Sequence, residues 1–128
     1  MKKTVTVFGA TGVAGSACVD ELLKQGVFKV QVLSRKTGQA ERSTMGVGHT
    51  DAAKQAQYSR WQAAGARVIE ADVTQHISLI PALRGTDYLV STVPYAATES
   101  QYAMIYAARE AGVERFVPSE FGAIYEWE

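Results

Sequence analysis

Apolar runs of strand length alternate with segments of helical periodicity along the chain. Each run contains valine, which favours the extended conformation. Strands that alternate with helices form parallel sheets, because each connection must cross back to the start of the next strand. We therefore predict a doubly wound α/β fold with three αβα layers and strand order 3-2-1-4-5. The expected strands are 4–8, 30–34, 67–71, 88–92 and 115–118.

The first helix is expected over residues 12–25. Ala14, Cys18 and Leu22 recur at intervals of four residues, which places them on one helical face and predicts that this face is buried. Gly26 is the expected stop, because glycine readily adopts the left-handed conformation that ends a helix. Cys18 is the only cysteine of the chain, so it can form no intramolecular disulfide and is expected to be a small buried apolar residue.

Two later helices carry different start signals. Ser78 is expected to cap a short helix, which places Pro81 in the first turn, where a missing N–H costs little. Thr98 and Gln101 have the spacing of a capping box, in which both side chains satisfy backbone N–H groups at the start of a helix. Gly112 is the expected end of that helix. Its apolar face is expected to comprise Ile105, Ala108 and Ala111.

Three glycines follow the first expected strand at intervals of three residues, at Gly9, Gly12 and Gly15. Gly9 allows a sharp turn, Gly12 allows the backbone to approach a phosphate without an intervening Cβ, and Gly15 allows the helix to pack closely on the strand. The helix N-terminus offers unpaired N–H groups and a positive dipole end to an anion. The pattern predicts a Rossmann-like site for a dinucleotide pyrophosphate. The alternative is a tight strand-to-helix turn that holds no ligand.

The second expected strand ends with basic residues. Ser34 is followed by Arg35, which lies twenty residues beyond Gly15, and by Lys36. An acidic residue at that distance would bind the ribose 2′-hydroxyl of NAD, whereas a basic residue suits the 2′-phosphate of NADP. Arg35 is the stronger candidate, because its planar guanidinium can hold phosphate through two hydrogen bonds. We therefore predict NADP(H) as the cofactor; the alternative is a solvated basic turn.

Further candidates follow the third and fourth expected strands. Asp72 is a candidate acceptor for the adenine amino group, and equally an ordinary turn or cap residue. Ser91, Thr92, Val93 and Pro94 close the fourth strand at the carboxyl edge, where ligands bind in open α/β sheets. We expect these residues to line the ribose side of the cofactor, although Pro94 would also serve to end the strand.

Two motifs indicate a family. Gly-Ala-Thr-Gly at 9–12 resembles the short-chain dehydrogenases, particularly their extended and atypical members. Together with Arg-Phe-Val-Pro-Ser-Glu-Phe-Gly at 115–122, it resembles the isoflavone reductase-like branch of the NmrA-like family. Segments 65–72 and 78–83 are similar to that family too, so the resemblance covers essentially the entire chain. Such reductases use NADPH to deliver hydride to an activated carbon of a small, often aromatic, substrate.

The resemblance also implies roles for individual residues. The strand end that contains Pro118, Ser119 and Phe121 would face the reacting end of the cofactor. The rest of the cofactor would be held by Gly9, Thr11, Gly12, Val13, Gly15 and Arg35.

The sequence departs from this family after the second motif. Family reductases supply a lysine as general acid or base and then a substrate domain, but only six residues follow Gly122. Tyr125 has no following lysine to lower its pKa, and Glu120 is more typical of a cap or a salt-bridge partner than of a proton donor. The catalytic residue is therefore unassigned. We expect the chain to bind cofactor and to turn over poorly, since losing a general acid costs about 10² to 10⁴ in rate.

Three functions fit these features. The leading hypothesis is the NADP(H)-binding half of an isoflavone reductase-like oxidoreductase, with the later strands and the substrate domain absent. The rival is an NmrA-like sensor that binds NADP without turnover and reports redox state to a protein partner. The third is a relic with no function of its own. The last expected strand would be an unprotected sheet edge, which predicts self-association.

Composition and sequence pattern argue against several other classes of protein. The chain of 128 residues has 13 basic and 13 acidic residues, so no net charge attracts it to nucleic acid or to an anionic membrane. His49 and His76 lie far apart without ligands at metal spacing, which predicts no metal site. The N-terminus leads directly into a strand and no apolar stretch reaches 18 residues, so we expect a cytoplasmic location.

A loop over 37–50 and a polar helix over 52–64 are also expected.

Overall fold

The computed structural model describes residues 2–35, 51–73, 75–93 and 99–119. A single five-stranded sheet has the order β3-β2-β1-β4-β5, and all neighbouring strands are parallel. The predicted fold class and strand order are confirmed. The observed strand ends differ from the expected ones by no more than one residue. The strands are β1 Thr4–Phe8, β2 Lys29–Arg35, β3 Arg67–Ala71, β4 Tyr88–Ser91 and β5 Arg115–Val117.

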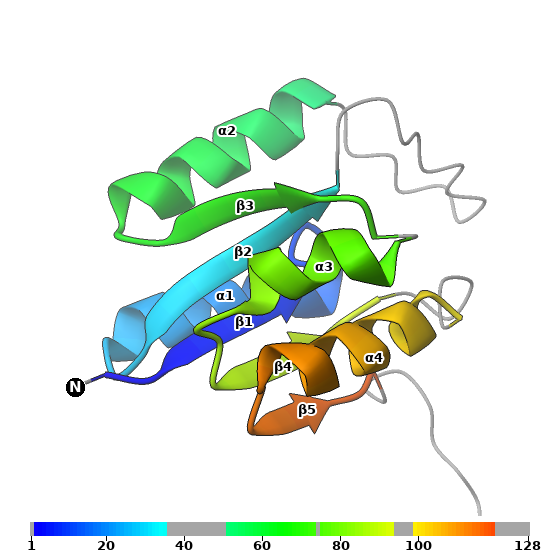
Figure 1. Ribbon diagram of the computed structural model, residues 1–128. Helices are drawn as coiled ribbons and strands as arrows, with labels where there is room; N and C mark the ends of the chain where they lie inside the picture. The colour runs from blue at the N-terminus through cyan, green and yellow to red at the C-terminus, as the bar shows by residue number, and fades with distance from the viewer. Residues whose placement is uncertain (1, 36–50, 74, 94–98, 120–128) are drawn as a thin grey trace, which may run out of the picture.

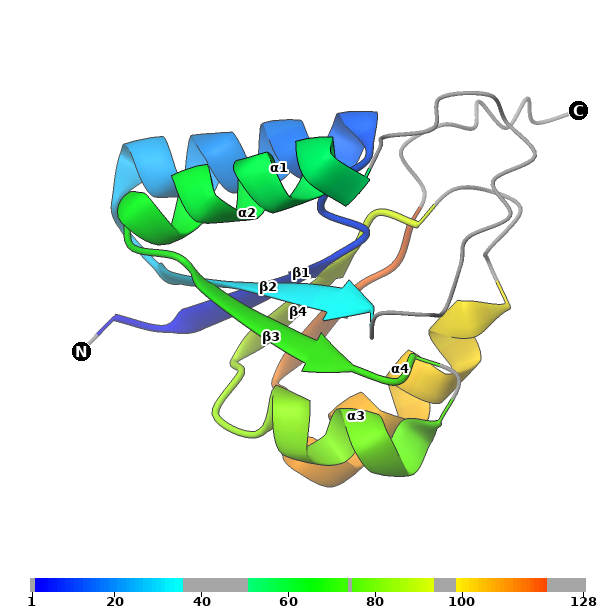
Figure 2. The same ribbon diagram turned by 90° about the horizontal axis from the view of Figure 1, so that it is seen from above.

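Four helices cover the two faces of the sheet, as the predicted three layers require (Figure 1). Helices α1 (Val13–Gln25) and α2 (Asp51–Ala63) lie side by side on one face. Helices α3 (His76–Leu83) and α4 (Ser100–Ala111) lie on the other face, as Figure 2 shows. No helix of the described residues is long and apolar enough to cross a membrane.

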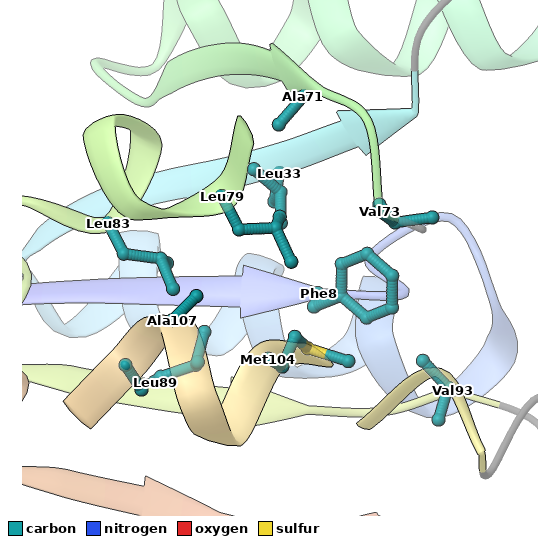
Figure 3. Packing of buried hydrophobic residues seen from close by; sticks show 11 residues of the cluster. Phe8, Leu33, Ala71, Val73, Leu79, Leu83, Leu89, Val93, Met104 and Ala107 are labelled. Atoms are coloured by element: carbon teal, nitrogen blue, oxygen red, sulfur yellow. The ribbon is translucent and has the colours of Figure 1, made fainter. Parts of the chain in front are cut away.

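The core on the α3 and α4 side is centred on the end of β1. Phe8 contributes its ring to this cluster, which also contains Leu79 and Leu83 of α3 and Met104 of α4 (Figure 3). All four side chains are essentially inaccessible to solvent. The Phe8 side chain therefore fixes the last residue of β1 immediately before the glycine turn.

The core on the other face contains a tryptophan that the sequence pattern did not reveal. Trp61 of the polar helix α2 is 1% exposed and packs with Val7, Val19 and Val32. Its indole Nε1 donates to Asp20 Oδ1 of α1 over 2.8 Å. A helix with weak amphipathic character is thus held by one large side chain, and the same residue joins α2 to α1.

The buried face of α1 differs from the expected one. Ala14 is exposed, whereas Gly15 and Val19 are buried, and Leu22 is half-buried. The close approach at Gly15 determines which side of the helix meets the sheet, so the buried face is rotated by one residue. Cys18 is half-buried beside the core, and burial raises the pKa of its thiol, which favours the unreactive protonated form.

The start of α3 also differs from the prediction. The helix follows Gln75, and Ser78 lies inside it. Instead of capping the helix, the Ser78 hydroxyl accepts the N–H of Asp72 over 3.0 Å. Pro81 consequently lies in the second turn rather than the first. The residue four positions earlier is the exposed Ile77, so its carbonyl can bond to water where the proline N–H is missing.

The predicted end of helix α4 and two of the three residues of its predicted apolar face agree with the structure, since Ala108 is buried and Ala111 packs against the core. Gly112 ends the helix in the left-handed conformation, as expected. The residue before the helix is Glu99, and Thr98 lies outside the described residues. Ile105 is 45% exposed, whereas Gln101 is buried. The Gln101 side chain also accepts the N–H of Ser119, a contact that the capping-box prediction did not include, and the capping box itself stays a prediction.

Strand β5 forms one edge of the sheet. It pairs with β4, and within the described part of the chain no strand pairs with its other side. Val117 is 41% exposed there. Open strand edges can pair with a second chain, so we expect concentration-dependent self-association. Analytical ultracentrifugation up to about 100 μM tests this expectation, and a monomer at all concentrations would contradict it.

Candidate cofactor-binding site

The turn between β1 and α1 is closed by a backbone hydrogen bond. Gly9 leaves β1 with a φ of +80°, which L side chains rarely adopt. The Gly12 N–H donates to the Gly9 carbonyl over 3.2 Å, and α1 starts after Gly12. No side chain of the described residues caps this helix, and its first turn contains no acidic residue. The start of α1 therefore presents backbone N–H groups and a positive dipole end that no acidic side chain of its first turn neutralises.

Two of the three glycines are required by the protein itself. A Cβ at Gly9 would lie 2.9 Å from the backbone carbon of Thr92. A Cβ at Gly15 would lie 2.2 Å from the Gly9 carbonyl oxygen and 2.6 Å from Thr92 Oγ1. These contacts are with packed atoms rather than the free end of a flexible side chain, so both positions need glycine for the turn to close.

Gly12 is different. Its φ of −75° is accessible to any residue. A Cβ at this position would meet only the Gly9 carbonyl oxygen, at 3.4 Å, within the described residues. Packing within the described residues thus gives no reason for glycine at position 12. A ligand that approaches the backbone closely would supply that reason, and a pyrophosphate fits it.

Thr92 anchors the turn from β4. Its hydroxyl donates to the carbonyls of Phe8 and Gly9 over 2.8 and 3.0 Å, and its N–H donates to Phe8 over 2.9 Å. Thr92 thus lies beside the glycine turn, and its hydroxyl donates within the protein, so its predicted contact with the ribose side of the cofactor stays a prediction. The neighbouring Ser91 is fully buried, and its hydroxyl has no hydrogen-bond partner in the described part of the chain.

Arg35 is the last residue of β2. Phe8, at the end of β1, pairs with Leu33, so β2 continues two residues farther and carries Arg35 past the end of β1. Arg35 is half-buried, and Ser34 is buried beside it. The sheet therefore brings the predicted 2′-phosphate residue to the same edge as the glycine turn.

Asp72 follows β3 at this edge, next to the end of β2. Its backbone closes the connection to α3, because its carbonyl accepts the Gln75 N–H over 3.2 Å and its N–H donates to Ser78. These bonds give its main chain the turn role that was the alternative. A contact between its carboxylate and adenine stays a prediction.

The ends of β4 and β5 are joined by a hydrogen bond. The Ser119 hydroxyl donates to the Val93 carbonyl over 2.7 Å. The Ser119 N–H donates to Gln101 Oε1 over 2.9 Å. The structure therefore brings together Ser119 and Val93, two residues that the sequence analysis assigned to the cofactor site separately, with Pro118 exposed next to them. Gln101 was missed as a member of this site, because its position suggested a helix cap.

Other predicted residues lie at the rim or beyond the described segments. Thr11 is half-buried and Val13 is 83% exposed at the start of α1. The described residues include no cluster of three metal-ligating side chains. The predicted residues outside the described segments are Lys36, Pro94, Glu120, Phe121 and Tyr125.

A hollow of about 620 Å³ lies at the opposite, amino edge of the sheet. Its lining includes four exposed cationic residues, Lys2, Lys29, Arg67 and Arg84. This edge is where α1, α2 and α3 end, and cations are favourable near helix C-termini. None of the three glycines of the turn lines this hollow, so it is separate from the candidate cofactor site.

Comparison with known families matches residues 1–127 to the NmrA-like family. The chain belongs to this family. This NmrA-like chain is 28% identical to isoflavone reductase from Pisum sativum, over 92% of the chain and 37% of that relative. It is 32% identical to phenylcoumaran benzylic ether reductase Pyrc5 from Pyrus communis, over 94% of the chain and 36% of that relative.

Solved structures of reductases resemble the fold of the NmrA-like chain. A crystal structure of isoflavone reductase has a TM-score of 0.80 at 28% identity and covers 95% of the chain and 37% of its own length. A structure of AtPrR2 with NADP+ and (+)pinoresinol has a TM-score of 0.77 at 31% identity, covering 94% and 37%. The chain thus spans little more than a third of the length of these relatives.

Proposed function

We propose that this chain is an NADP(H)-binding domain of the isoflavone reductase-like branch, with the pyrophosphate lying over Gly12 at the start of α1. The observation that carries this proposal is the glycine at position 12, which no contact among the described residues requires. The NADP+ in the related AtPrR2 structure supports the choice of cofactor.

The two halves of the dinucleotide would lie on either side of the glycine turn. The adenosine half extends over the ends of β2 and β3, where Arg35 holds the 2′-phosphate. The nicotinamide half extends over the ends of β4 and β5, because the strand order reverses between β1 and β4. The residues proposed for the adenosine half are Ser34, Arg35, Lys36 and Asp72. Those proposed for the nicotinamide half are Thr92, Val93, Pro94, Pro118, Ser119 and Phe121.

The proposal also includes an activity, which is hydride transfer from NADPH. Bound NADPH supplies a hydride, and the named relatives point to a small organic acceptor such as an isoflavone or a benzylic ether. The described residues hold the cofactor and leave the proton donor unassigned. A redox sensor that binds NADP without turnover is the second candidate, and a cytoplasmic location remains a prediction.

The proposal predicts a preference for NADPH over NADH. A charge-assisted contact between Arg35 and the 2′-phosphate contributes about 1.5 to 3 kcal/mol, which corresponds to roughly a tenfold to hundredfold lower Kd for NADPH. Arg35→Ala should remove most of this preference and leave the NADH affinity nearly unchanged. Calorimetric titration at one fixed salt concentration measures both effects, because salt screens the contact.

Arg67→Ala is a matched control. Arg67 is an exposed arginine on the adjacent strand β3, but it lies at the amino edge of the sheet. Its removal makes the same change in net charge, so it should leave the ratio of the two affinities unchanged. Equal affinities of the unmutated chain for NADPH and NADH would contradict the assignment of Arg35.

A further inference from the structure

Gln101 makes a contact that neither its helix nor its exposure requires. It lies in the first turn of α4 and is 8% exposed. Its Oε1 accepts the backbone N–H of Ser119, a residue 18 positions later in the chain, over 2.9 Å. A buried amide in a helix is usually satisfied by a neighbouring element, and here the neighbour is the segment that follows β5.

The same segment is held from a second side. The Ser119 hydroxyl donates to the Val93 carbonyl at the end of β4 over 2.7 Å. Ser119 is thus joined through its main chain to α4 and through its side chain to β4. Two hydrogen bonds from different elements restrict both the position and the rotation of the main chain at this residue.

The contact between Gln101 and Ser119 lies at the edge of the sheet where the cofactor is proposed to bind. The ends of β4 and β5 lie on the side of the glycine turn opposite β2. If Arg35 holds the adenosine end of the dinucleotide, the remaining half must extend across β4 and β5. The segment at Pro118 and Ser119, which Gln101 holds, would therefore lie next to the nicotinamide half.

We infer that Gln101 is a positioning residue, which sets the segment at Pro118 and Ser119 at the distance that the nicotinamide half of the cofactor requires. This inference rests on the proposed NADP(H)-binding function. Gln101 acts through the Ser119 main chain. Its loss should therefore weaken binding of the nicotinamide half and spare the adenosine half.

The test compares NADPH with adenosine 2′,5′-bisphosphate, which contains the adenosine 2′-phosphate but no nicotinamide. In Gln101→Leu, the NADPH affinity should fall about fivefold, the effect of one lost hydrogen bond, while the bisphosphate affinity should change less than about twofold. Titration calorimetry measures both constants, and far-ultraviolet circular dichroism shows whether the variant is folded.

Gln31→Leu is the matched control for a merely structural effect. Gln31 is 6% exposed on β2, and its Nε2 donates to the Ala82 carbonyl over 2.9 Å. The same substitution removes a similarly buried hydrogen bond far from β5. It should change neither affinity selectively. A selective loss of NADPH affinity in Gln31→Leu would overturn the inference.

Gln101→Met provides a second variant in case Gln101→Leu does not fold. Its unbranched side chain has a similar length but offers no amide oxygen to the Ser119 N–H, and the same selective loss of NADPH affinity is expected. An unmutated chain that binds NADPH no more tightly than the bisphosphate would overturn the inference but leave the proposed function intact. Binding of neither ligand would contradict the proposed function itself. Unchanged selectivity in both variants would overturn the inference alone.

Discussion

Gly15→Ala should lower the free energy of unfolding by about 2 to 3 kcal/mol, although alanine is normally the better residue in a helix. The added Cβ would lie 2.2 Å from the Gly9 carbonyl oxygen and 2.6 Å from Thr92 Oγ1. Relief of this overlap requires α1 to move from β1 or the bond between Thr92 and Gly9 to break. Overpacking and a lost hydrogen bond outweigh the gain of about 1 kcal/mol from helix propensity. Urea unfolding measures the difference.

Gly12→Ala is the control for this prediction. It adds the same methyl group three residues away, where the nearest atom is 3.4 Å distant within the described residues. Replacing glycine by alanine at an N-cap should cost less than about 1 kcal/mol. Equal destabilisation by the two substitutions would show that the close contact at Gly15 is relieved without cost.

Gly12→Val should reduce the affinities for NADPH and NADH by at least about a hundredfold, equivalent to about 2.7 kcal/mol of binding energy. The valine side chain would occupy the space through which the pyrophosphate approaches the start of α1, and both cofactors share that group. Gly12→Ala should give an intermediate loss. Calorimetric titration measures the affinities.

The stability of the same variants separates this effect from misfolding. Gly12 has an extended, ordinary backbone conformation with φ of −75° and ψ of 177°. Valine accepts these angles, so Gly12→Val should lose no more than about 1 kcal/mol of stability as an N-cap substitution. Retention of cofactor affinity in a folded Gly12→Val variant would contradict the placement of the pyrophosphate.

The strand order and the glycine turn were predictable because both depend on local pattern. Valine-rich runs separated by helical segments permit few parallel topologies, and the spacing of Gly9, Gly12 and Gly15 is itself a structural constraint. The sequence did not distinguish Gly12 from the other two glycines. That distinction depends on how the turn closes in three dimensions. A Cβ at Gly9 or Gly15 would overlap atoms of Thr92, and one at Gly15 would also overlap the Gly9 carbonyl oxygen.

The sequence left out contacts that form only when separate segments meet. The polar helix that contains Trp61 was predicted correctly, but the burial of Trp61 was not, because a single buried side chain leaves little trace in the periodicity of its neighbours. Ser78 and Gln101 were assigned as caps because both residue types commonly satisfy helix termini. Ser78 lies inside its helix and bonds to the main chain of Asp72, and Gln101 bonds to the main chain of Ser119, a contact that no cap prediction includes.

Amide chemical shifts of the isotopically labelled chain during titration with NADP+ locate the cofactor most directly. The proposed site predicts the largest changes at the amides from Gly9 to Gly15 and at Arg35, with further changes at Val93 and Ser119. The amides of Lys29 and Arg67, beside the basic hollow at the other edge of the sheet, should remain unchanged. Changes centred on Lys29 and Arg67, with the glycine turn unaffected, would contradict the proposed site.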